Sequence, residues 1–148
     1  MFTFAESRLT AGYPSRGSRQ RSIGKTMTTQ IFMVEDHPLM RRAYGMLLHR
    51  EPDLNLCGAA ASGEEALTRL PDCQPDLVIV DISLPGMDGL MLIEQLYQTQ
   101  PGLPILIVSA HEYSLYATRT LMPSVKGYIQ KHQALQRLVT TIRGVLAS

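Results

Sequence analysis

The segment Leu77-Val78-Ile79-Val80-Asp81 is an uninterrupted apolar run, rich in β-branched residues, that leads directly into a carboxylate. A run of this composition is typical of a central strand buried on both faces of a parallel sheet. Comparable runs recur along the chain, and the segments between them have helical periodicity. We therefore expect further strands at residues 31–34, 54–58, 105–108 and 125–129.

The segments between the expected strands carry helix signals. Pro38 fits the first turn of a helix that ends near Glu51-Pro52, because a residue in that turn needs no N–H donor. Ser62-Gly63-Glu64-Glu65 has the pattern of a capping box at the start of a second helix. A last helix has an apolar face, whose members are Leu135, Leu138, Val139, Ile142 and Leu146.

The alternation of strands and helices predicts the fold class and the number of domains. It indicates an α/β domain, a flavodoxin-like, doubly wound sheet of five parallel strands in the order 2-1-3-4-5, with helices on both faces. A chain of 148 residues with 45% hydrophobic content has room for one such core rather than two. We assign residues 27–148 to this single domain.

The first 26 residues differ in composition from the rest. Residues 1–26 are rich in Arg, Ser and Gly and lack apolar periodicity, which predicts a disordered N-terminal extension. A composition rich in Arg and Ser and poor in acids also fits an organellar targeting peptide, although no apolar helical face accompanies it. We favour a third interpretation, an upstream start codon or a cloning remnant, because Met27-Thr28-Thr29 has the form of a natural start.

The charge balance and the cysteines exclude several classes of protein. With 14 basic and 13 acidic residues, the chain has no bulk charge that would attract it to nucleic acid or to an anionic membrane. No apolar stretch approaches the roughly 18 to 20 residues of a membrane-spanning helix, so we expect a soluble, cytoplasmic protein. Cys57 and Cys73 have no metal-ligand spacing and no secretory signal precedes them, which predicts reduced thiols rather than a disulfide.

Polar residues stand at the carboxyl ends of the expected strands. Glu35-Asp36, Asp81 and Ser109 end or follow three of the strands, and Lys131 comes just after another. Open α/β sheets bind their ligands at this edge, so we expect these side chains to converge. Clustered carboxylates repel one another unless a cation or raised pKa values relieve the repulsion. Because the ligands would all be oxygens, the expected cation is Mg²⁺.

A carboxylate beside Mg²⁺, with an ammonium and a hydroxyl in reach, has the parts for phosphoryl transfer to itself. Asp81 is the expected nucleophile, because the apolar strand before it fixes its position. Lys131 would supply positive charge, and Ser109 a hydrogen bond, to the transferred group. Taken singly, each residue has an ordinary explanation as a helix cap, a solvated lysine or a turn hydroxyl. Their joint occurrence at successive strand ends favours a shared role in phosphoryl transfer over these separate structural explanations.

Four motifs in the chain are together highly specific. They are Val34-Glu35-Asp36-His37-Pro38, the segment 75–89, Val108-Ser109-Ala110 and the segment 126–131. From about residue 29 to the C-terminus, the chain resembles the receiver domain of bacterial two-component response regulators, particularly the NarL/FixJ-like group. The resemblance implies that Asp81 is phosphorylated by a histidine kinase or a phosphotransfer protein. It implies a signalling protein that assists its own phosphorylation and dephosphorylation, and not a conventional enzyme.

The resemblance also implies roles for single residues. The expected ligands of Mg²⁺ are Glu35, Asp36, Asp81 and the backbone carbonyl of Ser83. Ser109 and Tyr128 would form the switch, in which the hydroxyl moves toward the phosphoryl group and the ring turns inward. Ser83 and His111 lie where the family tunes the lifetime of the phosphoryl group. A homodimer of the phosphorylated form is an expected assembly, as is control of transcription through a missing or separate effector.

The chain departs from the family pattern in some respects, and two alternatives to a phosphorylated switch stand beside the resemblance. The chain stops after the last receiver helix, so we expect no DNA binding by this chain alone. Pro123 should end the fourth helix early, and Ala134-Leu135 replaces the usual Ser-Pro at the start of the fifth. One alternative is an aspartyl-phosphate phosphohydrolase, which usually has a carboxylate where Ser83 stands. The other is a protein-binding module that is never phosphorylated.

Overall fold

A computed structural model of the chain describes residues 28–84, 86–110 and 122–147. The expected extension at residues 1–26 lies outside this part of the chain, and so does the segment just before Pro123 that would form the fourth helix. Within the described residues strands and helices alternate, and the predicted α/β fold class is confirmed.

The strands form a single parallel sheet. Its members are β1 (Thr29–Val34), β2 (Leu54–Ala60), β3 (Leu77–Asp81), β4 (Ile105–Ser109) and β5 (Val125–Gln130). Their order across the sheet is β2-β1-β3-β4-β5, as predicted. Every residue of the central strand β3 is buried, which agrees with its uninterrupted apolar sequence.

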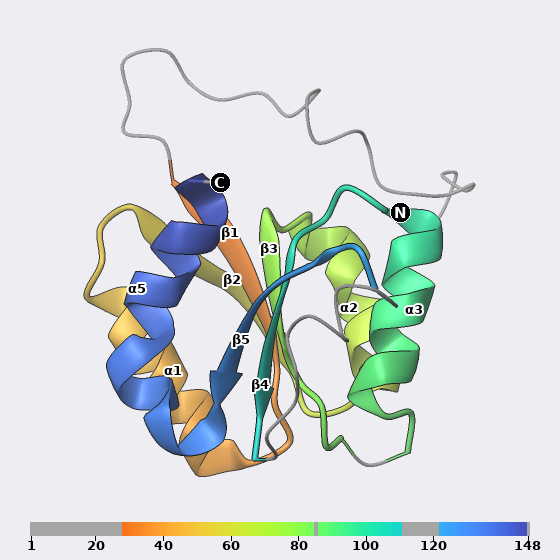
Figure 1. Ribbon diagram of the computed structural model, residues 1–148, viewed down its shortest axis with the longest axis horizontal. Coiled ribbons are helices and arrows are strands. Elements are labelled where there is room, and N and C mark those ends of the chain that lie inside the picture. The colour runs from red at the N-terminus through yellow and green to blue at the C-terminus, as the bar shows by residue number, and fades with distance from the viewer. Residues whose placement is uncertain (1–27, 85, 111–121, 148) are drawn as a thin grey trace.

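Helices cover both faces of this sheet. They are α1 (Pro38–His49), α2 (Gly63–Cys73), α3 (Gly89–Thr99) and α5 (Ala134–Ala147), with a 3₁₀ turn, η2 (Lys131–Gln133), before the last. Figure 1 shows α1 and α5 on one side of the sheet and α2 and α3 on the other. The doubly wound arrangement is therefore confirmed.

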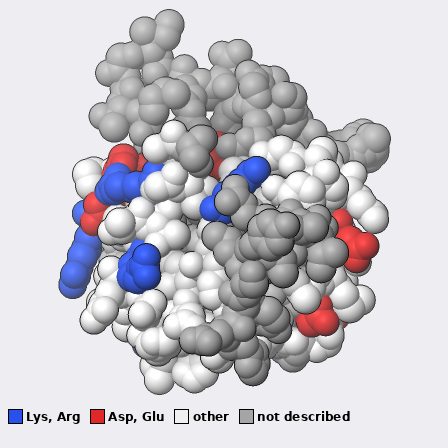
Figure 2. All heavy atoms as spheres, in the orientation of Figure 1, with Lys and Arg blue, Asp and Glu red and all other residues white. Residues whose placement is uncertain are grey.

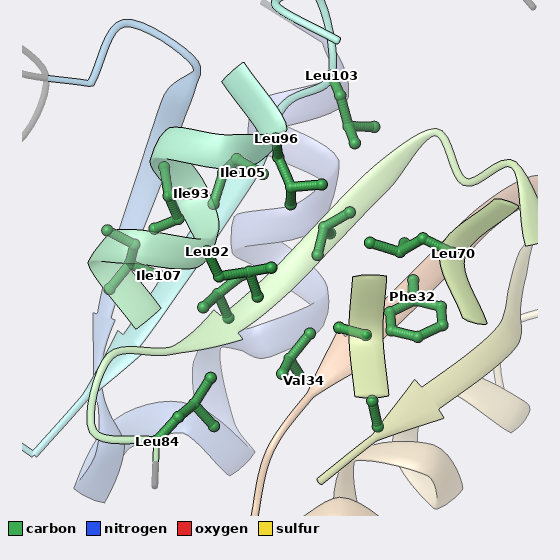
Figure 3. Packing of buried hydrophobic residues seen from close by; sticks show 14 of the residues in the cluster. Phe32, Val34, Leu70, Leu84, Leu92, Ile93, Leu96, Leu103, Ile105 and Ile107 are labelled. Atoms are coloured by element: carbon green, nitrogen blue, oxygen red, sulfur yellow. The ribbon is translucent and has the colours of Figure 1, made fainter. Parts of the chain in front are cut away.

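The sheet has a hydrophobic core on each face, because successive residues of a strand point to opposite sides. Ile31 and Met33 of β1 pack in the cluster that includes Tyr44 of α1. Phe32 and Val34 point the other way, into the cluster lined by α2 and α3, where Figure 3 shows Phe32 beside Leu70. Burial of each such side chain contributes about 1.5–3 kcal/mol, so the strands are fixed from both sides.

The start of α2 follows its sequence signal closely. Ser62 Oγ accepts a hydrogen bond from the Glu65 backbone N–H at 3.1 Å, and Glu65 Oε1 accepts one from the Ala61 N–H at 2.8 Å. The predicted capping box is present, with the return bond one residue earlier than in the usual motif. This cap directs Glu64, the residue between, toward the neighbouring loop described below.

The apolar face of α5 differs from the prediction at Leu135, which is 48% exposed. The other predicted members face the core, with Leu138 and Ile142 buried and Val139 and Leu146 partly buried, and Ala134 and Val145 are buried beside them. Leu135 lies about 100° further round the helix than Ala134, so both cannot face the sheet centrally. Ala134, which directly follows η2, takes the buried position.

Helix α5 comes very close to β5 at Gly127. A Cβ atom there would lie 2.8 Å from Leu106 Cδ1 and 3.0 Å from Val145 Cγ2. Any larger residue at this position would force the Leu106 and Val145 side chains to shift, and glycine lets the helix pack against the strand without that cost.

Cys57 of β2 and Cys73 of α2 form a disulfide, with their Cα atoms 5.7 Å apart. The prediction of reduced thiols is wrong for this structure. The two residues are separated by 16 positions, and α2 folds back along β2 so that its last residue returns beside the middle of the strand. The Cα separation lies within the range that a disulfide can bridge.

Candidate functional site

The predicted polar residues meet at the edge of the sheet formed by the carboxyl ends of the strands, the lower edge in Figure 1. Glu35 directly follows β1, Asp81 ends β3 and Ser109 ends β4. Lys131 is the first residue of η2, directly after β5. Parallel strands that end at one edge therefore deliver residues that are almost 100 positions apart in the chain.

The register of the sheet explains why these residues converge. Val34 of β1 pairs with Val80 of β3, so the next residues, Glu35 and Asp81, lie at the same level of neighbouring strands. Asp81 pairs in turn with Val108 of β4. Glu35 and Asp81 are only 1% and 2% exposed, so each carboxylate has given up most of its contact with water.

Lys131 links these two buried carboxylates. Its Nζ donates a hydrogen bond to Glu35 Oε2 at 3.0 Å and another to Asp81 Oδ2 at 2.9 Å. Burial by itself would lower the pKa of Lys131, but the hydrogen bonds to Asp81 and Glu35 outweigh it and hold the pKa above its ordinary value of 10.5. The side chain is a cation throughout the physiological range of pH.

Only one of the two carboxylate oxygens of Glu35 has hydrogen-bond partners among the described residues. Its Oε2 accepts hydrogen bonds from Lys131 and from the His37 backbone N–H, whereas Oε1 is buried with no hydrogen-bond partner among the described residues. Burial is the main cause that raises the pKa of Glu35 above its ordinary value of 4.5. A buried carboxylate oxygen without a donor is an atom that a bound cation would satisfy.

The carboxylates form a cluster that fits a divalent ion. Glu35, Asp36 and Asp81 each offer an oxygen, and these oxygens lie within 4.8 Å of one another. Asp36 is exposed while the other two are buried, so the cluster is open to water on one side. An all-oxygen set that leaves room for several waters is the environment Mg²⁺ prefers. The residues present therefore fit the expected ion, and a role for the carbonyl of Ser83 stays a prediction.

The loop after Asp81 is held by hydrogen bonds from its backbone. The Ser83 N–H donates to Asp81 Oδ1 at 2.9 Å, and the Met87 N–H donates to Glu64 Oε2 at 3.0 Å. Gly86 has a φ of +66°, and a Cβ atom there would lie 2.9 Å from Glu64 Oε2. Glycine is thus required both by the backbone conformation and by the space that Glu64 occupies.

Gly89 allows α3 to begin directly against the end of β3. A Cβ atom at this position would lie 2.6 Å from the Asp81 carbonyl oxygen and 2.7 Å from Ile82 Cα. Both are backbone atoms that cannot move without displacing the carboxylate itself. Asp88 Oδ1 caps the helix by accepting from the Met91 N–H at 2.9 Å. The start of α3 is therefore fixed closely against the end of β3.

The two residues expected to form a switch lie on adjacent strands. Ser109 is fully buried opposite Gln130 at the end of β4. Tyr128 lies next to Ile107 on β5, half-buried, and packs against the core on the side of α2 and α3. Their movement stays a prediction. Of the two residues expected to tune phosphoryl lifetime, Ser83 is exposed beside Asp81, and His111 lies outside the described residues.

Two residues near the site were not predicted from the sequence. Glu64 was assigned to the helix cap alone, and its bond to Met87 depends on how α2 lies against the loop. The Tyr44 hydroxyl is buried with no hydrogen-bond partner in the described part of the chain. Burial, with a further contribution from the charge of Glu35, raises the pKa of Tyr44 to about 12. An aromatic residue on an apolar helix face gives no sequence signal of such a neighbour.

The described surface adds little to the site. None of the described helices is both long and apolar enough to cross a membrane. Figure 2 shows basic and acidic side chains in small separate groups among uncharged atoms on the face drawn, and not as one broad patch of a single sign. This distribution agrees with the formal net charge of +1.

Comparison with known proteins gives consistent matches. Residues 31–143 match the family described as "Response regulator receiver domain". Response regulator GacA of Pseudomonas viridiflava is 32% identical over 118 residues, which make up 80% of this chain and 55% of that protein. The transcriptional regulatory protein DesR of Bacillus subtilis (strain 168) is 34% identical over 116 residues, 78% of this chain and 57% of that one. The chain thus spans about half the length of the curated relatives it matches.

A solved structure is similar in both fold and sequence. It is the crystal structure of a LuxR-family two-component response regulator from Aurantimonas sp. SI85-9A1. The TM-score is 0.73 at 32% sequence identity, and the match covers 81% of this chain and 86% of that chain.

Proposed function

The chain belongs to the response regulator receiver domain family of two-component signalling, and from this premise we propose that it is a switch controlled by phosphorylation of Asp81. The observation that carries the proposal is the contact of Lys131 Nζ with both Asp81 and Glu35. An ammonium fixed beside a buried carboxylate is poised to stabilise negative charge on a group transferred to that carboxylate.

The proposed step is an in-line displacement at phosphorus. One carboxylate oxygen of Asp81 attacks the phosphorus of a phosphohistidine on the donor protein, so that an O–P bond forms while the N–P bond breaks. The bonding electron pair returns to the imidazole nitrogen of the donor. Ser83 N–H and Lys131 hold the two Asp81 oxygens, and this fixes the carboxylate for attack.

The acidic cluster provides the proposed metal site. Its ligands are Glu35, Asp36, Asp81 and the backbone carbonyl of Ser83, and Mg²⁺ bound there supplies positive charge next to the phosphoryl oxygens. Lys131 shifts one hydrogen bond from the carboxylate to a phosphoryl oxygen, and the Ser109 hydroxyl donates another. The same residues promote the later hydrolysis of the aspartyl phosphate, and the side chains of Ser83 and His111 set how long it persists.

The proposed output is a change of conformation on the β4 and β5 side of the sheet. When Ser109 moves toward the phosphoryl group it vacates space at the end of β4, and the ring of Tyr128 turns inward to fill it. The new charge-assisted hydrogen bonds favour this arrangement over the unphosphorylated one. Tyr128 is half-buried on β5, which places it between the core and the surface.

The proposed partners follow from the family. The phosphoryl donor is a sensor histidine kinase or a phosphotransfer protein, and the phosphorylated form associates as a homodimer in the cytoplasm. Control of transcription requires an effector beyond the described receiver domain. The similar protein DesR of Bacillus subtilis is a transcriptional regulatory protein, which supports this kind of output.

The proposal is tested by incubating the full chain with a small-molecule phosphodonor and Mg²⁺. Intact mass spectrometry should show the addition of a single phosphoryl group, and peptide mapping should place it on Asp81. A chain that takes up none, or that takes it up when Asp81 is replaced by Asn, contradicts the proposal. Sustained turnover of a generic phosphomonoester in the same assay would instead indicate a phosphohydrolase.

A further inference from the structure

The disulfide between Cys57 and Cys73 joins two weak points of the backbone. Cys57 lies at the register shift between β1 and β2, where Ile31 pairs with Leu56 but Phe32 pairs with Gly58. Cys57 is thus the extra residue of a bulge. Because β2 is an edge strand that pairs only with β1, its hydrogen-bonded ladder is interrupted there with no second neighbour to compensate.

The partner cysteine ends a helix whose last turn is also weak. Pro71 lies inside α2 and cannot donate a backbone hydrogen bond to the preceding turn. Gln74, which follows Cys73, caps the helix with a φ of +50°, a conformation that residues other than glycine rarely adopt. The disulfide therefore attaches a poorly held helix end to a poorly held strand.

Both cysteines lie at the border of the core formed with α2 and α3, and each residue is only partly buried. A thiolate in solution can reach a partly exposed sulfur, whereas a sulfur sealed in a core is inert.

We propose that Cys57 and Cys73 are a reversible thiol–disulfide site that fastens α2 to the edge strand according to the redox state. Oxidation by a small disulfide such as glutathione disulfide proceeds by two exchange steps. One protein thiolate attacks the small disulfide and releases one thiol, and the second protein thiolate then displaces the other. The protein loses two electrons and two protons, and one molecule of glutathione disulfide becomes two molecules of glutathione.

The opposite end of α2 connects this site to the loop after Asp81. Glu64, in the first turn of the helix, accepts the hydrogen bond from the Met87 N–H. The neighbouring Gly63 also lies close to Met87, because a Cβ atom added at Gly63 would be 3.0 Å from Met87 Sδ. A helix fastened at its last residue frays less at its first turn, because fraying of a short helix is cooperative. The redox state should therefore also affect the order of residues 82–84 and 86–88. This inference does not depend on phosphoryl transfer.

The expected effects are measured on the full chain in defined buffers of glutathione and glutathione disulfide. Intact mass spectrometry should show the loss of two hydrogens in the oxidising buffer and their recovery in the reducing one. Closing a loop of this length should raise Tm by about 10 °C on oxidation. Hydrogen exchange of the peptides that cover β2, α2 and residues 82–88 should slow in the oxidised form.

Matched variants distinguish the disulfide from other effects of the buffer. The double variant Cys57→Ser/Cys73→Ser should have one Tm in both buffers, equal to that of the reduced wild type within the small cost of the substitutions. Either single variant should remain a monomer on a non-reducing gel. A wild type that retains both thiols in the oxidising buffer, carries bound glutathione, forms a cross-linked dimer, or oxidises without a change in Tm would overturn the proposal.

Discussion

Two cross-links between distant segments stabilise different edges of the same sheet. At the carboxyl edge, the Lys131 ammonium bridges Glu35 and Asp81 through hydrogen bonds. At the β2 side, a covalent bond joins Cys57 to Cys73. The contacts of Lys131 bring charged groups together where they are largely buried, which costs solvation energy, whereas the disulfide contains no charged group. The buried charge is the arrangement that the proposed phosphoryl transfer would use, whereas the covalent link fastens the border of the sheet.

The largest expected effect separates the two cross-links completely. Asp81→Asn should abolish phosphoryl uptake, because the amide is no nucleophile, while formation of the Cys57–Cys73 disulfide should continue unchanged. The measurement is intact mass after incubation with a small phosphodonor and Mg²⁺. The matched control is Asp72→Asn, an exposed residue of α2, which should retain normal uptake.

The second effect tests the ammonium itself. Lys131→Met should slow phosphoryl uptake about 10²- to 10³-fold, the usual loss when one donor to developing charge is removed. Rates are followed by quench and mass spectrometry at saturating phosphodonor. Lys126→Met removes an exposed lysine from the same strand region and should leave the rate unchanged. Equal rates in both variants would show that Lys131 has only a structural role.

The third effect concerns the burial of Glu35. Without Mg²⁺, folded Glu35 holds its proton more tightly than the unfolded chain does, since its pKa is raised above 4.5. Stability should therefore fall as pH rises from about 4.5 through the folded pKa, and Glu35→Gln should lack this fall. At ten times its Kd, Mg²⁺ should stabilise wild type by about 1.4 kcal/mol and the variant much less.

Thermal unfolding between pH 4 and pH 8, with and without Mg²⁺, measures both parts of this prediction. Glu94→Gln, at an exposed position of α3, serves as the control and should follow wild type. A Mg²⁺-induced rise in Tm that survives in Glu35→Gln would place the ion elsewhere.

The smallest expected effect at neutral pH is that of Tyr44→Phe. The hydroxyl is buried without a hydrogen-bond partner among the described residues, so its removal at neutral pH should change stability by no more than about 1 kcal/mol. Folded Tyr44 holds its proton up to a pKa of about 12, against 10 when unfolded. Wild type should lose stability relative to the variant as pH rises from 10 to 12. Denaturant titrations at pH 7 and pH 11 measure this, with Tyr97→Phe as the exposed control.

The convergence of polar residues at the carboxyl edge was predictable from the sequence because it follows from a general rule of sheet topology. Residues that directly follow parallel strands meet at one edge whatever the details of the loops. The apolar run that ends at Asp81 therefore predicted both the central strand and the position of the carboxylate. Glu35 and Lys131 converged on it through register alone.

The features that were missed depend on how helices lie against the sheet. The contact of Glu64 with Met87, the pairing of Cys57 with Cys73 and the exposure of Leu135 are all set by helix length and rotation. A shift of one residue turns a helix by about 100°, and periodicity does not fix the rotation that closely. Cysteine spacing likewise reports local motifs and not residues that a returning helix brings together.

Gly127 has a mechanical consequence. Because residue 127 has no side chain, the Val145 and Thr141 side chains of α5 pack directly on the backbone of β5. A small displacement of β5, the strand that carries Tyr128, would therefore move α5 together with it. A larger residue at position 127 would push α5 away from β5 and weaken the coupling between the movements of the strand and the helix.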